Sequence, residues 1–121
     1  MRILLIEDHH DTAQAISKLL SLHTHEVVIV GSRAEAHRIC TEDRHFDLMI
    51  CDIGLPDGEG WDLARLAQKE GSRAIALTGY GMPDDIERSK REGFATHLLK
   101  PVEFTQLEEA IDRAFVGEER P

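Results

Sequence analysis

The stretch LMICDIGLPDG, residues 48–58, decides the fold. It begins with a continuous apolar run, Leu48 to Cys51, and passes directly into Asp52 and a turn rich in Gly and Pro. A run without alternating polar residues is typical of a strand covered on both faces, as in a parallel sheet between two layers of helices. Because an isolated carboxylate is costly to bury at the end of such a strand, Asp52 needs a structural or functional reason to be there.

Four further apolar runs have the same character, and the segments between them are long enough for helices. Together the five runs predict an α/β fold of the (βα)5, flavodoxin-like type. In this fold a five-stranded parallel sheet of order 2-1-3-4-5 carries helices on both faces. We expect a single domain over residues 1–121 with a frayed tail at 117–121. The four runs are Ile3–Ile6, Val27–Val30, Ala74–Leu77 and Thr96–Leu99.

Two helical segments carry additional signals. Ser32 and Glu35 have the spacing of a capping box, in which each side chain accepts a hydrogen bond from the other residue's backbone N–H. Between Pro83 and Gly93, Ile86 is almost the only large apolar residue. We therefore expect the fourth helix to be loosely packed.

Composition excludes several classes of protein. With 41% hydrophobic and 31% charged residues, the 121-residue chain is typical of a soluble globular domain, and its apolar runs are too short to insert into a membrane. The net charge of −9 argues against direct binding of nucleic acid. With only Cys40 and Cys51 in the chain we expect no disulfide framework, and because no signal-peptide pattern follows Arg2 we expect a cytoplasmic protein.

Polar residues follow four of the five predicted strands. Glu7 and Asp8 follow the first run, Asp52 the third, Thr78 the fourth and Lys100 the fifth. The carboxyl ends of parallel strands meet at one edge of the sheet, where ligands bind, and in the order 2-1-3-4-5 these four strands are contiguous. The sequence therefore predicts a shared pocket.

The predicted pocket has the chemistry of phosphoryl transfer. Three carboxylates in one place repel one another unless a cation lies among them, and oxygen ligands of this kind suit Mg²⁺. Lys100 could neutralise a phosphoryl group from the other side, and the Thr78 hydroxyl could donate to one of its oxygens. Asp52 would then act as the nucleophile and form an aspartyl phosphate.

Four motifs stand out in the sequence: LLIEDHHD, LMICDIGLPDGEGWDL, ALTGYG and HLLKPV. Together they resemble the motifs of the receiver domains of two-component response regulators. This resemblance spans residues 2–116 and implies a phosphoacceptor signalling module of a two-component system or phosphorelay. Its partner would be a histidine kinase or a histidine phosphotransfer protein, and a homodimer on activation is left open. The module would catalyse only its own phosphorylation and dephosphorylation.

The resemblance also implies a metal site. Asp52 would be the phosphoacceptor, and Asp8 and Asp52 would bind Mg²⁺ directly together with the backbone carbonyl of Gly54. Glu7 would bind the ion through water. Gly54 and Tyr80 would border the path of the attacking water and influence the lifetime of the phosphorylated state.

Three further residues would carry the switch. Lys100 would pair with the phosphate, and Thr78 would move toward it, followed by the fourth helix. The active surface would comprise the fourth helix, the fifth strand and the fifth helix. His97 occupies the aromatic switch position, three residues before Lys100, where receiver domains usually carry Tyr or Phe. Because an imidazole can be charged, its packing can depend on pH.

Several alternatives remain open at the level of sequence. A Mg²⁺-dependent phosphatase with an aspartyl nucleophile would need a cap and a second acid where Gly54 lies. A flavodoxin-like electron carrier would need a Ser/Thr/Gly loop after the first strand, where this chain has residues 7–10, EDHH. A pseudo-receiver that only binds proteins is opposed by the complete site. The chain could be a stand-alone regulator or the receiver of a hybrid sensor kinase.

Single features also have simpler interpretations. Acidic residues such as Glu7 and Asp8 favour helix starts, and Asp52 could be an ordinary turn residue. His23 and His25 raise the alternative of a transition-metal site, although they lie before the second strand and no zinc motif accompanies them. Trp61 is expected in the core. Only the coincidence of all the polar signals at one sheet edge favours the functional interpretation.

Overall fold

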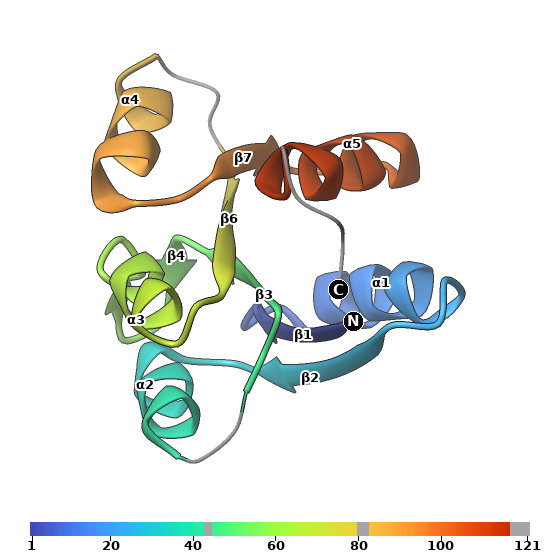
Figure 1. Ribbon diagram of the computed structural model, residues 1–121, viewed down its shortest axis with the longest axis horizontal. Coiled ribbons are helices and arrows are strands. Elements are labelled where there is room, and N and C mark those ends of the chain that lie inside the picture. Colours follow the sequence, from blue (N-terminus) through green and yellow to red (C-terminus); the bar gives the residue numbers. More distant parts are fainter. Residues whose placement is uncertain (43–44, 80–82, 117–121) are drawn as a thin grey trace.

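A computed structural model describes residues 1–42, 45–79 and 83–116, and these form one α/β unit around a parallel sheet (Figure 1). The strands occur in the order β2-β1-β3-β6-β7. This is the predicted order 2-1-3-4-5, because β6 and β7 are the fourth and fifth strands of this sheet. The predicted tail at 117–121 and Tyr80 lie outside the described residues. The strands are β1 (Arg2–Ile6), β2 (Glu26–Val30), β3 (Leu48–Asp52), β6 (Arg73–Thr78) and β7 (Thr96–Leu99).

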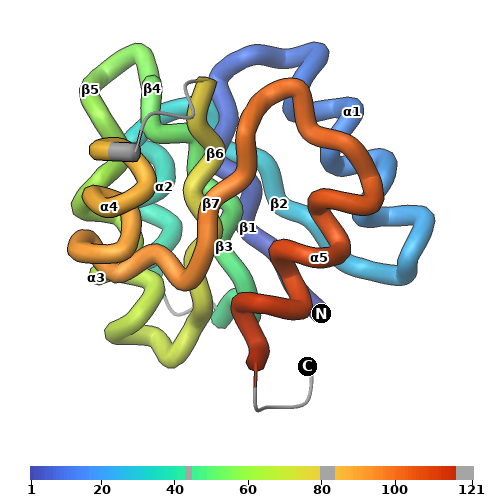
Figure 2. Tube along the Cα trace, turned by 90° about the horizontal axis from the view of Figure 1, so that it is seen from above, coloured from blue at the N-terminus to red at the C-terminus, as the bar shows by residue number. Residues whose placement is uncertain are grey.

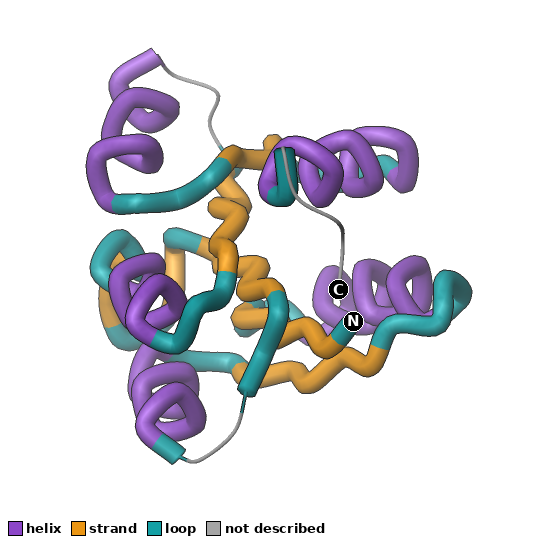
Figure 3. The backbone as a smooth tube through the Cα atoms, viewed as in Figure 1, coloured by secondary structure: helices purple, strands orange, loops and turns teal. Residues whose placement is uncertain are grey.

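Helices cover both faces of the sheet, as predicted (Figure 3). Seen from above, α1 and α5 lie on one side of the strands, and α2, α3 and α4 lie on the other (Figure 2). None of the helices in the described part of the chain is both long and apolar enough to cross a bilayer. The helices are α1 (His10–Ser21), α2 (Arg33–Thr41), α3 (Leu63–Lys69), α4 (Pro83–Glu92) and α5 (Phe104–Ala114).

The strands supply a separate hydrophobic core to each helical layer. In β1, Ile3 and Leu5 belong to the core beneath α1 and α5, whereas Leu4 and Ile6 belong to the core beneath α2 and α3. Successive side chains of a strand point to opposite faces, so a strand buried on both sides must be apolar throughout. This explains the continuous apolar runs of the sequence.

The register of the sheet brings the strand ends together. Ile6 pairs with Cys51, and Asp52 pairs with Leu77, the residue before Thr78. The residues that follow β1, β3 and β6 therefore emerge side by side at one edge.

A short antiparallel hairpin follows β3 and was not predicted. It consists of β4 (Gly54–Leu55) and β5 (Gly58–Glu59). Strands of two residues leave no periodic signal in the sequence. At its turn Gly58 has a φ of +133°, a conformation that residues with a side chain rarely adopt.

The hairpin is tied to the start of α2. The Asp57 carboxylate accepts hydrogen bonds from the backbone N–H groups of Arg33 (2.8 Å) and Ala34 (2.9 Å), and these bonds lower the pKa of Asp57 below its ordinary value. Of the two hydrogen bonds predicted for the capping box, one is present. Ser32 Oγ accepts the Glu35 N–H, but the Glu35 carboxylate accepts the N–H of Gly31 instead of that of Ser32. The N-terminus of α2 is thus capped both locally and by a residue of the distant hairpin.

Candidate functional site

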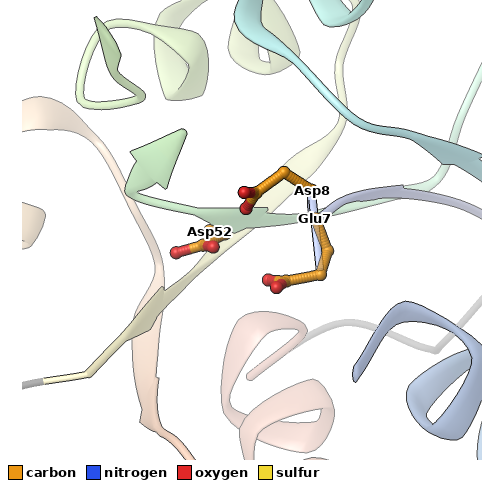
Figure 4. Close-up of side chains that lie close together, drawn as sticks. All are labelled: Glu7, Asp8 and Asp52. Atoms are coloured by element: carbon orange, nitrogen blue, oxygen red, sulfur yellow. The ribbon is translucent and has the colours of Figure 1, made fainter. Parts of the chain in front are cut away.

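Three carboxylates from two strand ends meet at the carboxyl edge of the sheet. Glu7 and Asp8 follow β1, Asp52 ends β3, and the three side chains extend into one space (Figure 4). One carboxylate oxygen from each lies within 4.8 Å of the other two. Glu7 and Asp52 are buried, with exposed fractions of 2% and 6%, whereas Asp8 is exposed to solvent.

Lys100 joins this cluster from the carboxyl end of β7, the edge strand of the sheet. Its Nζ donates hydrogen bonds to both carboxylate oxygens of Glu7, at 3.0 and 2.8 Å, and to Asp52 Oδ2 at 2.9 Å. Its backbone N–H donates to the carbonyl of Thr78 at 2.9 Å, which extends the pairing of β7 with β6 by one residue. The Lys100 ammonium is therefore fixed at the carboxylate cluster by residues from three strand ends.

The charges of the cluster are incompletely balanced. Burial raises the pKa of Glu7 above its ordinary value; the Lys100 ammonium opposes this rise, and the Asp52 carboxylate adds to it. Burial acts to lower the pKa of Lys100, but the hydrogen bonds to Glu7 and Asp52 outweigh it, so this pKa is raised. One ammonium shared between two buried carboxylates, with Asp8 beside them, leaves the cluster net negative and suited to another cation.

The donor set fits a hard divalent cation. All the side-chain donors are carboxylate oxygens, which suit Mg²⁺ or Ca²⁺ and not a soft transition metal. Ligands on opposite sides of a Mg²⁺ ion lie about 4 Å apart, so a spacing of up to 4.8 Å closes with small side-chain rotations. Among the described residues this is the one group of His, Cys, Asp and Glu side chains with metal-binding spacing.

Asp52 lines a cavity of about 360 Å³. Lys100 and the buried Thr78 line it, and the Gly54 N–H donates to Asp52 Oδ1 at 3.1 Å. This volume exceeds that of several water molecules, so a phosphoryl group fits beside the carboxylate. Of the predicted site residues that the structure describes, all but His97 lie together at this edge: Glu7, Asp8, Asp52, Gly54, Thr78 and Lys100. The cavity is lined by Asp52, Ile53, Gly54, Glu59, Trp61, Thr78, Gly79, Asp85 and Lys100.

His97 lies away from the cavity, at the outer side of β7. It is partly buried and lines a groove of about 210 Å³ with Glu109 and Arg113 of α5. Burial, and then the positive charges of Lys90 on α4 and of Arg113, lower the pKa of His97. His97 therefore lies between the two helices that flank β7 and does not reach the carboxylates.

Sequence reasoning missed the acidic and aromatic side chains of the cavity wall. Glu59 of β5, Trp61 and Asp85 of α4 all line it. Trp61 was expected in the core and is buried, with 6% exposed, but one side of it also borders the cavity. The acidic and aromatic residues that follow Asp52 in the motif DIGLPDGEGW were the available signal.

The histidines before β2 have contacts that do not involve a metal. The ring of His23 packs against Phe104, with ring centroids 4.6 Å apart. His25 Nδ1 lies 3.1 Å from the N-terminal amine. The structure gives no support to the transition-metal alternative among these residues.

A family model for the response regulator receiver domain matches residues 3–112. The chain belongs to this family. It is 30% identical to the response regulator protein FleR of Pseudomonas aeruginosa over 119 residues, which are 97% of this chain and 25% of FleR. It is 25% identical to sporulation initiation phosphotransferase F of Bacillus subtilis, and the match covers 93% of this chain and 91% of that protein. The chain thus spans about a quarter of the length of FleR and nearly all of the second relative.

Solved structures of receiver domains have the same fold. A response regulator receiver domain from Clostridium thermocellum superposes with a TM-score of 0.82 at 34% identity, covering 93% of this chain and 92% of that one. The receiver domain of a sensor histidine kinase from Pseudomonas aeruginosa PAO1 gives a TM-score of 0.79 at 26% identity, with coverage of 93% and 94%. That structure has a magnesium ion coordinated in its active-site cleft.

Proposed function

We propose that this receiver domain accepts a phosphoryl group onto Asp52 from a phosphohistidine of a histidine kinase or histidine phosphotransfer protein, with Mg²⁺ as cofactor. The observation that carries the proposal is the contact of the Lys100 ammonium with Asp52 Oδ2, at 2.9 Å, beside the three-carboxylate cluster. A carboxylate, a fixed ammonium and a cluster of carboxylates lie beside one another here, and this supports the proposal because phosphoryl transfer needs a positioned nucleophile and cations around it.

Four residues would hold the metal. Asp8, Asp52 and the backbone carbonyl of Gly54 would bind Mg²⁺ directly, and Glu7 would bind it through water. The burial of Glu7 and its hydrogen bonds to Lys100 support this indirect role, because its carboxylate is already occupied. When bound, the ion would neutralise charge that develops on the transferring phosphoryl group.

The chain's own residues would perform the transfer. A carboxylate oxygen of Asp52 attacks the phosphorus, a P–O bond forms, and the P–N bond of the donor breaks with its electron pair remaining on the imidazole. Lys100 stabilises the negative charge of the equatorial oxygens. Dephosphorylation is the attack of water on the same phosphorus. We propose that the domain catalyses only these two reactions of its own carboxylate and turns over no external substrate.

The switch would follow from the same cavity. The Thr78 hydroxyl would donate to a phosphoryl oxygen, and the segment leading into α4 would follow it, changing the surface formed by α4, β7 and α5. His97 would take part as a residue of that surface. A homodimer through this surface on activation is part of the proposal. The excess of acidic residues supports a protein partner over direct contact with nucleic acid.

Phosphorylation with a small phosphodonor tests the proposal. The wild-type chain incubated with acetyl phosphate and Mg²⁺ should gain the mass of one phosphoryl group, and EDTA should prevent this. Asp52→Asn should abolish the adduct, whereas Asp57→Asn, the same change at an exposed residue of the hairpin, should keep it. An adduct that persists in Asp52→Asn would overturn the assignment. Catalytic turnover of an aryl phosphate would instead favour a phosphatase.

A further inference from the structure

Three residues connect the wall of the phosphorylation cavity to α4. The indole N–H of Trp61 donates a hydrogen bond to Glu59 Oε2. The Arg88 guanidinium carbon lies 4.6 Å from the centre of the Trp61 ring, and its Nη1 lies 4.0 Å from the same Glu59 oxygen. Glu59 and Trp61 both line the cavity, and Arg88 belongs to α4. The Glu59 carboxylate is thus held at the cavity wall by an indole and a guanidinium.

The position of Glu59 matters because of the charge that the cavity must accept. Glu59 and Asp85 line it in addition to Asp52, and the Lys100 ammonium is already bonded to Glu7 and Asp52. A phosphoryl group would add about two negative charges. A Glu59 side chain free to turn toward Asp52 would oppose it by Coulomb repulsion.

Arg88 can contribute this restraint only while α4 is docked. Within α4, Ser89 is buried and Ile86 only partly so, and Arg88 stacks on Trp61, whose ring also packs edge to face on Phe94 with centroids 6.5 Å apart. Cation–π contacts of this kind contribute about 0.5–2 kcal/mol each. Because α4 has so little apolar contact, this is a substantial share of the free energy that holds the helix in place.

We propose that Arg88 and Trp61 are positioning residues that hold and neutralise Glu59, so that docking of α4 sets how readily Asp52 accepts a phosphoryl group. This inference rests on the proposed function. By thermodynamic reciprocity, a phosphoryl group on Asp52 tightens the contact of Arg88 with Trp61 and Glu59. The cavity and α4 are thereby coupled through a charged wall residue, in addition to any movement of Thr78.

Binding of beryllium fluoride, a stable mimic of a phosphoryl group, tests the proposal in the full chain with Mg²⁺ by calorimetry. Glu59→Gln should tighten binding about two- to fivefold, and Arg88→Met should weaken it by a similar factor, the range expected for exposed ion pairs. In the double variant the affinity should lie within about twofold of that of Glu59→Gln, because Arg88 acts through Glu59. Arg91→Met removes the same charge from the last turn of α4 and should leave the affinity unchanged.

The fluorescence of Trp61, the only tryptophan in the chain, provides a second readout. Beryllium fluoride should change its emission in the wild type, and Arg88→Met should remove most of that change while leaving far-UV circular dichroism intact. Additive effects of Glu59→Gln and Arg88→Met, or equal affinities of Arg88→Met and Arg91→Met, would overturn the inference. Wild-type binding that does not depend on Asp52 would instead overturn the proposed function.

Discussion

Helices α4 and α5 both flank β7, but they are held to the sheet in different ways (Figure 1). Among the α4 residues whose burial the structure describes, Ser89 alone is buried, and Ile86 is only partly buried. In α5 a continuous apolar face is buried, so this helix is part of the core. The buried residues of α5 are Leu107, Ala110, Ile111 and Ala114.

The two faces of β6 also differ in side-chain size. Ile75 and Leu77 lie in the core beneath α5, whereas Ala74 and Ala76 face the other helical layer. β6 thus presents large side chains to the layer that contains α5 and only methyl groups to the layer that contains α4. The region beside the cavity with the least buried apolar area is therefore the one best suited to move, since local opening costs least there.

The largest effect that this comparison predicts is on α5. Leu107→Ala removes a fully buried side chain and should lower the free energy of unfolding by about 2–5 kcal/mol. Urea denaturation followed by circular dichroism measures this change. A loss below about 1 kcal/mol would show that α5 is not part of the cooperative core.

The next largest effect is expected from Mg²⁺ binding, which should change amide exchange in α5 but not in α4. Its proposed ligands follow β1 and β3, and α4 supplies none of them. Binding at 10 to 100 times the dissociation constant should therefore stabilise the whole fold by about 1–3 kcal/mol and slow exchange of α5 amides that open by global unfolding. Exchange of α4 amides, which open locally, should not change.

Hydrogen exchange with and without Mg²⁺ measures both effects. Asp8 is an exposed member of the proposed ligand set, so Asp8→Asn should remove the Mg²⁺-dependent protection of α5 without disturbing the core. Equal slowing of exchange in α4 and α5 would show that α4 opens only when the whole domain unfolds, and would contradict the comparison.

A smaller effect is expected for Ile86→Ala. Because Ile86 is only partly buried, the loss of unfolding free energy should be about 1 kcal/mol or less. Amide exchange should accelerate within α4 and stay unchanged in α5. A global loss as large as that for Leu107→Ala would mean that α4 is anchored as firmly as α5.

The sequence predicted the parts of the fold that are dictated by burial. Strands buried on both faces must be apolar throughout, so runs such as Ile3–Ile6 predicted β1 nearly to the residue. The β4–β5 hairpin was not predicted because each of its strands has only two residues, and because Asp57 ties it to the N-terminus of α2, more than twenty residues away in the sequence. Such tertiary contacts leave no local pattern.

The candidate site was predictable where it follows from the parallel sheet, and it was not predictable where it depends on tertiary contacts. Parallel strands must end at one edge, so the residues after each strand had to meet, and Glu7, Asp52 and Lys100 do. Glu59 and Trp61 could not be placed, because they reach the cavity only through the unpredicted hairpin and the loop that follows it. Their pairing with Arg88 depends on the docking of α4, which no spacing rule encodes.

His97, between the two helices, provides the smallest and most direct test of the comparison. Its pKa is lowered by burial and by Lys90 of α4 and Arg113 of α5, while Glu109 lies in the same groove. A histidine whose folded-state pKa is depressed adds stability that is full above its ordinary pKa and is lost as pH falls through the folded-state value. Between about pH 8 and about pH 5 the wild type should therefore lose stability relative to His97→Phe.

The separate contributions of the two helices can be read by NMR titration of the His97 ring. Lys90→Met and Arg113→Met should each raise the pKa of His97, and Lys90→Met should raise it more, because Lys90 contributes more than Arg113 to lowering it. If only Arg113→Met changes this pKa, α4 spends most of its time in solution too far from β7 for Lys90 to act on the ring. The restraint of Glu59 by Arg88 would then be correspondingly weak, because both contacts require the same docked helix.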